Sequence, residues 1–272
     1  MVMNALKIRE LTLETGRPKV VVPVVSSDPK EIIEECEKIR EMPCQMIEWR
    51  ADTYLSALDD PETVMEEKDF YLDIIKILDD INFIVDGRPV IFTVRSIAEG
   101  GCAELDRESI ARIQSLVAQS KLADIIDIEL FDGNGALDSG FLNGIIGEIH
   151  GYGCKVMVSH HDFSGMPAPA ELVELVEIMA ETGADIYKIA AMAYSKEDAE
   201  NLLKATAYLS RKDIGPVVSI AMGESGRPAR VAAGRYGSCM TFAAGKKASA
   251  PGQVGVYDME KMLDDYYGGK DR

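Results

Sequence analysis

Residues 156–183 have the sequence VMVSHHDFSGMPAPAELVELVEIMAETG, in which a short apolar run leads into a longer amphipathic stretch. The first part, 156–161, begins with consecutive apolar residues, which is typical of a parallel strand buried on both faces. In the second part, 169–182, apolar side chains recur at helical spacing: Leu172, Leu175, Val176 and Met179. Gly183 follows as a helix-ending residue. The stretch therefore predicts one unit of a strand followed by a helix.

The same alternation extends over most of the chain. Short apolar runs predict eight strands at 20–25, 46–50, 90–95, 125–129, 156–161, 186–190, 217–222 and 240–243. Amphipathic stretches at 29–42, 195–210 and 257–267 predict further helices, the first with Asp28 as its N-cap. Eight such units in about 250 residues favour a (β/α)8 TIM barrel. A doubly wound open sheet is the alternative, although no G-x-G-x-x-G follows a strand.

No break in composition divides the chain, so we expect a single domain over 1–272. The segment 6–14 alternates weakly and precedes the first unit. We expect it to form a short strand or hairpin that closes the barrel floor.

Composition excludes several classes of function. The 272 residues carry a formal net charge of −17, which argues against binding to nucleic acid or to an anionic membrane surface. The five cysteines are scattered and form no C-x-x-C pair, and no Cys/His spacing fits zinc. No run reaches transmembrane length. The sequence therefore predicts a reduced, cytoplasmic protein without a metal site.

Charged residues interrupt several of the predicted strands. Burying a charge costs several kcal/mol unless the charge is paired or used. Those residues are Glu48 and Arg50 in the second strand, Arg95 at the end of the third, Asp127 and Glu129 in the fourth, and Lys188 in the sixth. Because the active sites of (β/α)8 barrels lie at the carboxyl ends of strands, these side chains mark a candidate site. Structural ion pairs remain the alternative for Glu48, Asp127 and Glu129.

Lys188 suggests the type of chemistry. An isolated lysine in an apolar strand suits an amine nucleophile, because desolvation and nearby arginines would hold it neutral. With a histidine to move a proton and Glu99 to orient that histidine, the set predicts a Schiff-base enzyme that acts on an anionic carbonyl compound. His160 and His161 point to opposite faces of their strand, and spacing alone does not decide between them.

Five sequence blocks resemble one family. They are EWRAD at 48–52, FTVRSIAEGG at 92–101, SHHDF at 159–163, KIA at 188–190 and KKASAPGQ at 246–253. They occur in order between about Lys19 and Tyr257 and resemble the type I 3-dehydroquinate dehydratases of the shikimate pathway. One departure is Tyr187, which stands where the family usually has proline.

The resemblance implies roles for the matching residues. Lys188 would form an imine with C3 of 3-dehydroquinate, His161 would take a proton from C2 and protonate the departing C1 hydroxyl, and Glu99 would orient His161. The substrate would contact Glu48, Arg50, Arg95, Arg230, Ser249, Gln253, Met222 and Phe242. Arg230 is favoured over Arg227 as the partner of the substrate carboxylate.

The resemblance also bears on cofactors and assembly. It implies no cofactor, no metal and a homodimer, and it suggests that the loop carrying Ser249 and Gln253 closes over the site. Two other functions are considered: a class I aldolase that shares the imine but breaks a C–C bond, and a non-catalytic sensor of a shikimate-pathway ligand.

Overall fold

Eight parallel strands form one sheet whose order follows the chain. The computed structural model describes residues 5–58, 68–102, 104–212 and 214–268. The strands are β3 (Lys19–Val24), β4 (Met46–Arg50), β5 (Val90–Thr93), β6 (Ile125–Glu129), β7 (Lys155–Asp162), β8 (Ile186–Met192), β9 (Val217–Met222) and β10 (Met240–Phe242). They lie in the order β10-β3-β4-β5-β6-β7-β8-β9. Between the end strands, the Cys239 N–H donates to the Val217 carbonyl at 2.9 Å, so the sheet curls into a nearly closed barrel.

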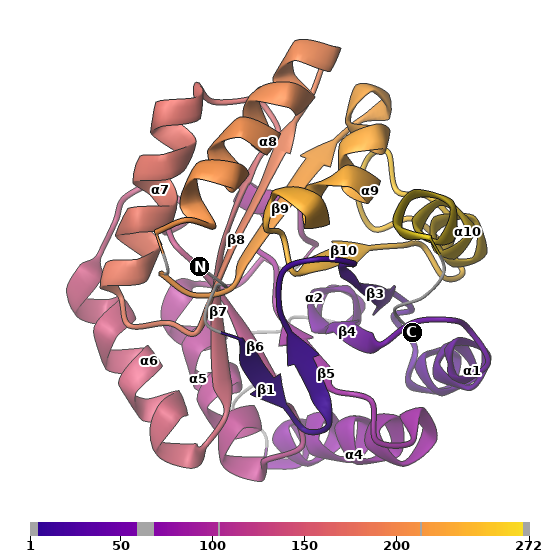
Figure 1. The fold of residues 1–272 in the computed structure, drawn as a ribbon. Helices are drawn as coiled ribbons and strands as arrows, with labels where there is room; N and C mark the ends of the chain where they lie inside the picture. Colours follow the sequence, from indigo (N-terminus) through magenta and orange to yellow (C-terminus); the bar gives the residue numbers. More distant parts are fainter. Residues whose placement is uncertain (1–4, 59–67, 103, 213, 269–272) are drawn as a thin grey trace.

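Helices surround the strands, as Figure 1 shows. They are α1 (Pro29–Arg40), α2 (Ala51–Leu55), α4 (Lys68–Val85), α5 (Arg107–Ser120), α6 (Ser139–Tyr152), α7 (Pro169–Glu181), α8 (Lys196–Leu209), α9 (Arg227–Tyr236) and α10 (Val256–Tyr267). Asp28 caps α1 by accepting hydrogen bonds from the backbone N–H groups of Lys30 and Glu31. The sequential order of the parallel strands confirms the TIM-barrel prediction and excludes the doubly wound sheet.

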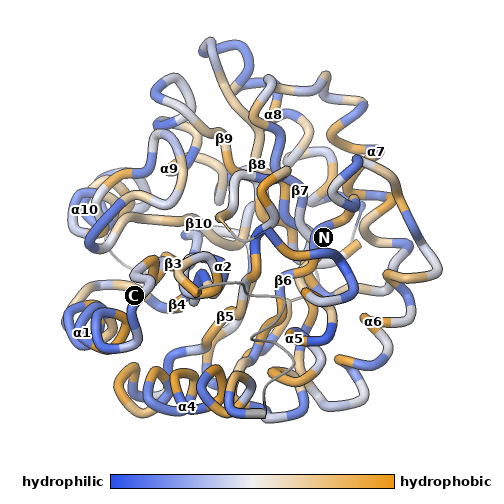
Figure 2. The backbone as a smooth tube through the Cα atoms, turned by 180° about the vertical axis from the view of Figure 1, so that it is seen from behind, coloured by the Kyte–Doolittle hydropathy of each residue, from blue (hydrophilic) through white to orange (hydrophobic). Residues whose placement is uncertain are grey.

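Strand alternation divides the interior into two apolar regions. Outward-facing side chains such as Trp49 and Phe92 pack between the barrel and the helices, with their rings 5.5 Å apart. Inward-facing side chains such as Met46, Ile125 and Met157 fill the lower part of the barrel. Figure 2 shows the corresponding hydrophobic strands inside helices of mixed hydropathy.

An N-terminal hairpin covers the floor of the barrel. Strands β1 (Leu6–Ile8) and β2 (Leu11–Leu13) pair antiparallel. Ile8 and Leu13 are buried against the inward-facing apolar side chains. Arg9 in the turn donates from Nε to Asp124 Oδ1 at 2.7 Å, which ties the hairpin to the start of β6. The hairpin form of the predicted N-terminal element is confirmed.

The predicted strand boundaries need two corrections. Strand β5 ends at Thr93 rather than at Arg95, because the Ser96 N–H turns to the side chain of Glu129 and leaves the ladder. Strands β7 and β8 run to Asp162 and Met192, beyond the predicted ends, because Asp162 still pairs with Ala191 and Met192 still pairs with Met222 of β9.

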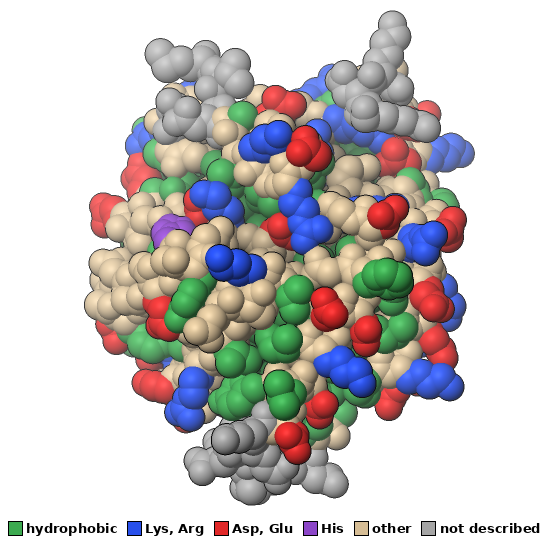
Figure 3. All heavy atoms as spheres, turned by 90° about the horizontal axis from the view of Figure 1, so that it is seen from below, with side chains coloured by type: hydrophobic (Ala, Val, Ile, Leu, Met, Phe, Trp, Pro, Cys, Tyr) green, Lys and Arg blue, Asp and Glu red, His purple; other side chains and the backbone are tan. Residues whose placement is uncertain are grey.

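The surface mixes both signs of charge. In the view of Figure 3, lysine and arginine side chains lie among acidic ones rather than along one basic stripe. Among the residues that the structure describes, no helix combines the length and hydropathy needed to cross a bilayer. The single-domain assignment over 1–272 stays a prediction, and residues 1–4, 59–67, 103, 213 and 269–272 lie outside the described ranges.

Candidate active site

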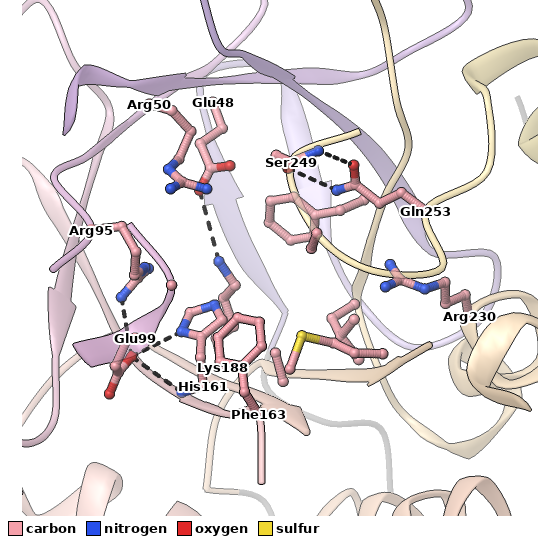
Figure 4. A pocket seen from close by; sticks show the side chains of 16 residues that line it. Glu48, Arg50, Arg95, Glu99, His161, Phe163, Lys188, Arg230, Ser249 and Gln253 are labelled. Atoms are coloured by element: carbon pink, nitrogen blue, oxygen red, sulfur yellow. Dashed lines mark hydrogen bonds and ion pairs between the residues drawn. The ribbon is translucent and has the colours of Figure 1, made fainter. Parts of the chain in front are cut away.

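One pocket opens at the carboxyl ends of the strands. It spans about 490 Å³ of space, part of it open to solvent. All eleven side chains predicted from the sequence line it: Glu48, Arg50, Arg95, Glu99, His161, Lys188, Met222, Arg230, Phe242, Ser249 and Gln253. Figure 4 shows these side chains converging from several strands and from the loop after β10. Their individual roles remain predictions, but the fold brings all of them together.

Arg95 is the centre of a buried ion network. Its Nη2 donates to Asp127 at 2.7 Å, and its Nη1 donates to Glu129 at 3.1 Å and Glu99 at 3.3 Å. Nη1 also donates to the Ser159 hydroxyl at 3.0 Å. Burial works against the charge of Arg95, but the three carboxylates raise its pKa overall. Arg95 therefore acts mainly on protein groups, even though it also lines the pocket.

Lys188 lies deeper in the barrel and faces two carboxylates. Its Nζ is 3.5 Å from Asp127 Oδ2 and 3.7 Å from Glu48 Oε1, and it lies 4.5 Å from the centre of the Phe242 ring. Arginine neighbours were expected to hold the amine neutral, but its nearest charged partners are acidic. Strand alternation explains the difference, because it placed Glu48 and Asp127 on the same inner face as Lys188.

Asp127 serves both cations at once. Burial works to raise the pKa of Asp127, but Arg95 and Lys188 together lower it below its ordinary value. Asp127 is therefore a carboxylate shared between the ion network and the candidate nucleophile. The predicted interior ion pairs of Asp127 and Glu129 are present, and they adjoin the pocket.

His161 is held by Glu99. Its ring Nδ1 lies 2.9 Å from Glu99 Oε2, and its backbone N–H donates to the same oxygen at 3.1 Å. Burial, followed by the charges of Arg95, Lys188 and Arg50, lowers the pKa of His161 well below its ordinary 6.5. A neutral imidazole oriented through Nδ1 presents Nε2 as a base. Figure 4 shows His161 beside Lys188.

A tight turn places Glu99. Helix η1 (Ile97–Glu99) starts at Ser96, whose hydroxyl accepts from the Glu99 N–H, and ends at Gly100 with φ of 81°. A Cβ on Gly101 would lie 1.8 Å from the Arg95 carbonyl oxygen. The two glycines therefore let the chain fold back onto the end of β5 and direct the Glu99 side chain toward β7.

Arg50 and Glu48 are also fixed by protein partners. Arg50 makes a two-bond fork to Asp52, with Nε–Oδ1 at 2.7 Å and Nη2–Oδ2 at 2.8 Å. Asp52 accepts as well from the Cys102 N–H at 3.2 Å, which links this turn to the loop that carries Glu99. Thr93 donates to Glu48 Oε1 at 2.9 Å. These contacts hold both side chains in place at the wall of the pocket.

Arg230 differs from the other cations of the pocket. It is 1% exposed and donates from Nη2 to the Pro251 carbonyl at 2.8 Å, whereas its buried Nε and Nη1 have no hydrogen-bond partner in the described structure. Burial, and then the charge of Arg227, lower the pKa of Arg230 to about 10. Arg227 itself is paired with Glu224 at 2.9 Å on the surface. Arg230 is thus ready to accept an anionic partner, and Arg227 faces elsewhere.

The loop after β10 covers this side of the pocket. The Ser249 N–H donates to Gln253 Oε1 at 2.7 Å, and Gln253 Nε2 donates to Ser249 Oγ at 2.9 Å. The two predicted side chains therefore brace each other across the loop. The Pro251 carbonyl oxygen in this loop accepts a hydrogen bond from Arg230 Nη2, which connects the loop to that side chain.

Three contributors were not selected from the sequence. Asp52 fixes Arg50, Ser159 donates to Asp127 at 2.7 Å, and Phe163 lines the pocket above Gly100. Asp52 and Phe163 stand inside the quoted EWRAD and SHHDF blocks, and Ser159 shares its strand face with His161. These positions in the sequence could have identified the three residues as members of the site.

No ligand set for a metal is found in the part of the chain that the structure describes. There, no group of three or more His, Cys, Asp or Glu side chains is arranged to hold an ion. The absence of a metal requirement stays a prediction.

The barrel and the pocket define a class. A buried lysine beside an oriented neutral histidine, at the carboxyl end of a (β/α)8 barrel, belongs to an enzyme that forms an imine with a carbonyl compound. The model of the type I 3-dehydroquinase family matches residues 20–270. The chain belongs to the type I 3-dehydroquinase family.

Individual relatives agree with this assignment. The chain is 35% identical to 3-dehydroquinate dehydratase of Bacillus licheniformis over 259 residues, which cover 95% of this chain and 96% of the relative. It is similar to the crystal structure of 3-dehydroquinate dehydratase from Geobacillus kaustophilus, with a TM-score of 0.87, 28% identity and coverage of 99% and 98% of the two chains. The type I enzyme from Clostridium difficile, solved with covalently modified comenic acid, gives the same TM-score and identity over 98% and 99%.

The turn that carries Glu99 provides a stability test. Gly101→Ala should lower the free energy of unfolding by about 1–3 kcal/mol, because the new methyl group overlaps the Arg95 carbonyl. Chemical denaturation measures the change. Gly133→Ala is the matched control, since a Cβ there meets nothing within 4 Å, and its effect should stay within about 0.5 kcal/mol. Equal stability of the two variants would contradict the described turn.

Proposed function

We propose that Lys188, His161 and Glu99 carry out the dehydration of 3-dehydroquinate to 3-dehydroshikimate in this chain. The observation that carries this proposal is the convergence of the three side chains in one pocket of a family member. The family assignment supplies the reaction, and the geometry supports the roles.

Imine formation is the first step. Lys188 Nζ attacks the C3 ketone of the substrate, and the carbonyl oxygen leaves as water after proton transfers. Before the attack the amine has to be free of its extra proton. Glu48 and Asp127 lie within 3.7 Å of Nζ, and His161, which lines the same pocket, is a neutral base for that proton. The resulting iminium draws electrons from C2 and acidifies its hydrogen.

Elimination follows at His161. Its Nε2 takes a proton from C2, and the electron pair passes through the enamine to expel the C1 hydroxyl, which leaves as water with a proton from the same ring. Hydrolysis of the product imine then frees Lys188. The water consumed in hydrolysis replaces the water lost on imine formation, so the net reaction releases one water. Glu99 stabilises the imidazolium that forms between the two proton transfers.

Substrate binding is assigned to the rest of the pocket. Arg230 supplies two unpartnered guanidinium nitrogens for the substrate carboxylate. Glu48, Arg50 and Arg95 contact the ring hydroxyls, Met222 and Phe242 pack against the ring, and Ser249 and Gln253 hold the covering loop over it.

Trapping the imine tests the nucleophile. Sodium borohydride with 3-dehydroquinate should attach the reduced ligand to Lys188, which peptide mass spectrometry locates. Lys188→Ala should lower kcat by more than about 1,000-fold, because the covalent route is lost. Lys196→Ala, at an exposed lysine of α8, is the control and should keep its activity. Full activity of Lys188→Ala, or a trapped product with a broken C–C bond, would reject the proposal, the latter in favour of an aldolase. Tight ligand binding without turnover in the unmodified protein would favour a sensor.

The acid limb of the pH profile tests His161. Burial and nearby cations lower the pKa of His161, so the neutral base persists as the pH falls through 6.5. The value of kcat/KM should therefore hold at pH 6.5 and decline only at lower pH. Initial rates from the ultraviolet absorbance of the enone product give this profile. An acid limb centred above pH 6.5 would contradict the described environment of His161.

We further propose that the protein acts as a homodimer in the cytoplasm, as the family resemblance implies. Size-exclusion chromatography with light scattering should give about twice the 29.8 kDa chain mass. A single species at the mass of one chain, at micromolar concentration, would overturn the dimer.

A further inference from the structure

Two consecutive histidines at the end of β7 hold the same carboxylate. His161 Nδ1 lies 2.9 Å from Glu99 Oε2, and His160 Nδ1 lies 2.9 Å from Glu99 Oε1. Neighbouring strand residues normally point to opposite faces and share no partner. Here they do share one, because η1 carries Glu99 over the rim of the barrel, where its two oxygens are reached from both faces of β7.

The two oxygens of Glu99 are supported unequally. Oε2 accepts from the His161 ring, the His161 backbone N–H and Arg95. For Oε1, the only contact within the described residues is His160. Glu99 is 6% exposed, so water has little access to replace a lost donor. The orientation of the carboxylate plane therefore depends on His160.

The protonation pattern follows from this geometry. An ionised carboxylate only accepts hydrogen bonds, so both facing Nδ1 atoms carry hydrogens. For His161 this leaves the Nε2 lone pair free for the substrate. Burial raises the pKa of Glu99 above its ordinary 4.5, whereas the hydrogen bond from His160 and the charge of Arg95 oppose that rise. His160 thus favours the ionised Glu99 that His161 needs.

We propose that His160 is a positioning residue of the reaction: by donating to Glu99 Oε1 it fixes the carboxylate whose other oxygen holds the base, His161. This role rests on the proposed function. The competing role is packing alone, since the His160 ring meets Phe131 edge-on with centroids 5.0 Å apart.

Two substitutions separate donation from packing. His160→Phe keeps a flat ring against Phe131 but has no donor. His160→Asn loses the ring but places an amide donor near the position of Nδ1. We expect His160→Phe to lower kcat about 10- to 100-fold with less than about a threefold change in KM. His160→Asn should recover kcat to within about fivefold of the unmodified enzyme. His150→Asn is the matched control, because His150 pairs with Asp185 away from the pocket, and its kinetics should be unchanged.

The pH profile gives a readout that packing would not move. The charged and titratable groups facing Glu99 are Arg95, Glu129, His160 and His161. Without the His160 donor, the pKa of Glu99 rises, so the carboxylate protonates at a higher pH. The acid limb of kcat should therefore shift upward in His160→Phe and return in His160→Asn.

A spectroscopic measurement covers the case of a poorly folded variant. Nitrogen-15 NMR of labelled histidine reports which ring nitrogen of His161 carries hydrogen. The unmodified enzyme and His160→Asn should show the Nδ1–H form, and His160→Phe should show a mixture. If His160→Phe does not fold, an unchanged His161 tautomer in His160→Leu overturns the proposal.

The outcomes also separate this proposal from the proposed function. If His160→Phe has the kcat and the acid limb of the unmodified enzyme, the proposed role of His160 is overturned. A His160→Asn variant as slow as His160→Phe would overturn it too. In either case borohydride still traps Lys188 in the unmodified enzyme. Failure of that trapping would overturn the proposed function itself.

Discussion

The buried guanidinium of Arg95 is the interaction on which the interior depends. Asp127, Glu129 and Glu99 all lie within 3.3 Å of its nitrogens, so loss of Arg95 would remove a cation that three carboxylates share. Through Asp127 the network reaches Lys188, and through Glu99 it reaches His161. The candidate nucleophile and the candidate base are therefore placed by one cation that need not touch the reacting atoms. The inward-facing carboxylates are tolerated because this cation lies among them.

The cations of the pocket differ in the carboxylates with which they are already paired. Arg50 is occupied by Asp52, Arg95 by its three carboxylates, and Lys188 lies between Glu48 and Asp127. Among the residues that the structure describes, Arg230 has one hydrogen-bond partner, the backbone carbonyl of Pro251. Among the described side chains that line the pocket, Arg230 is thus the arginine with unpartnered nitrogens that could pair with an anion. Under the proposed function, a chain with a net charge of −17 would bind a carboxylate through this local positive group, because nearby charges outweigh distant surface charges.

The sequence alone predicted the barrel and eleven of the residues that line the pocket, but it did not predict the partners of those residues. The β-then-α alternation fixes the fold class, and strand alternation puts Glu48, Asp127 and Lys188 on one inner face. The quoted family blocks add the loop residues Glu99, Ser249 and Gln253. The alternation of side chains along a strand does not predict where a loop lies above the strand ends. For that reason the double contact of Glu99 with His160 and His161 emerged only from the folded chain, and so did the two carboxylates that contact Lys188.

The floor hairpin has a consequence for the movement of water. Ile8 and Leu13 seal the lower end, and the inward apolar side chains fill the space between them and Lys188. Among the described residues, the lower part of the barrel is thus filled, and the pocket opens at the carboxyl ends of the strands. Under the proposed function, water expelled from the ketone would leave past the bound ring, and the water that later cleaves the product imine would enter by the same mouth of the pocket. Because Ser249 and Gln253 line this mouth, opening of their loop would, under the proposed function, govern the hydrolytic half of the cycle as well as substrate entry.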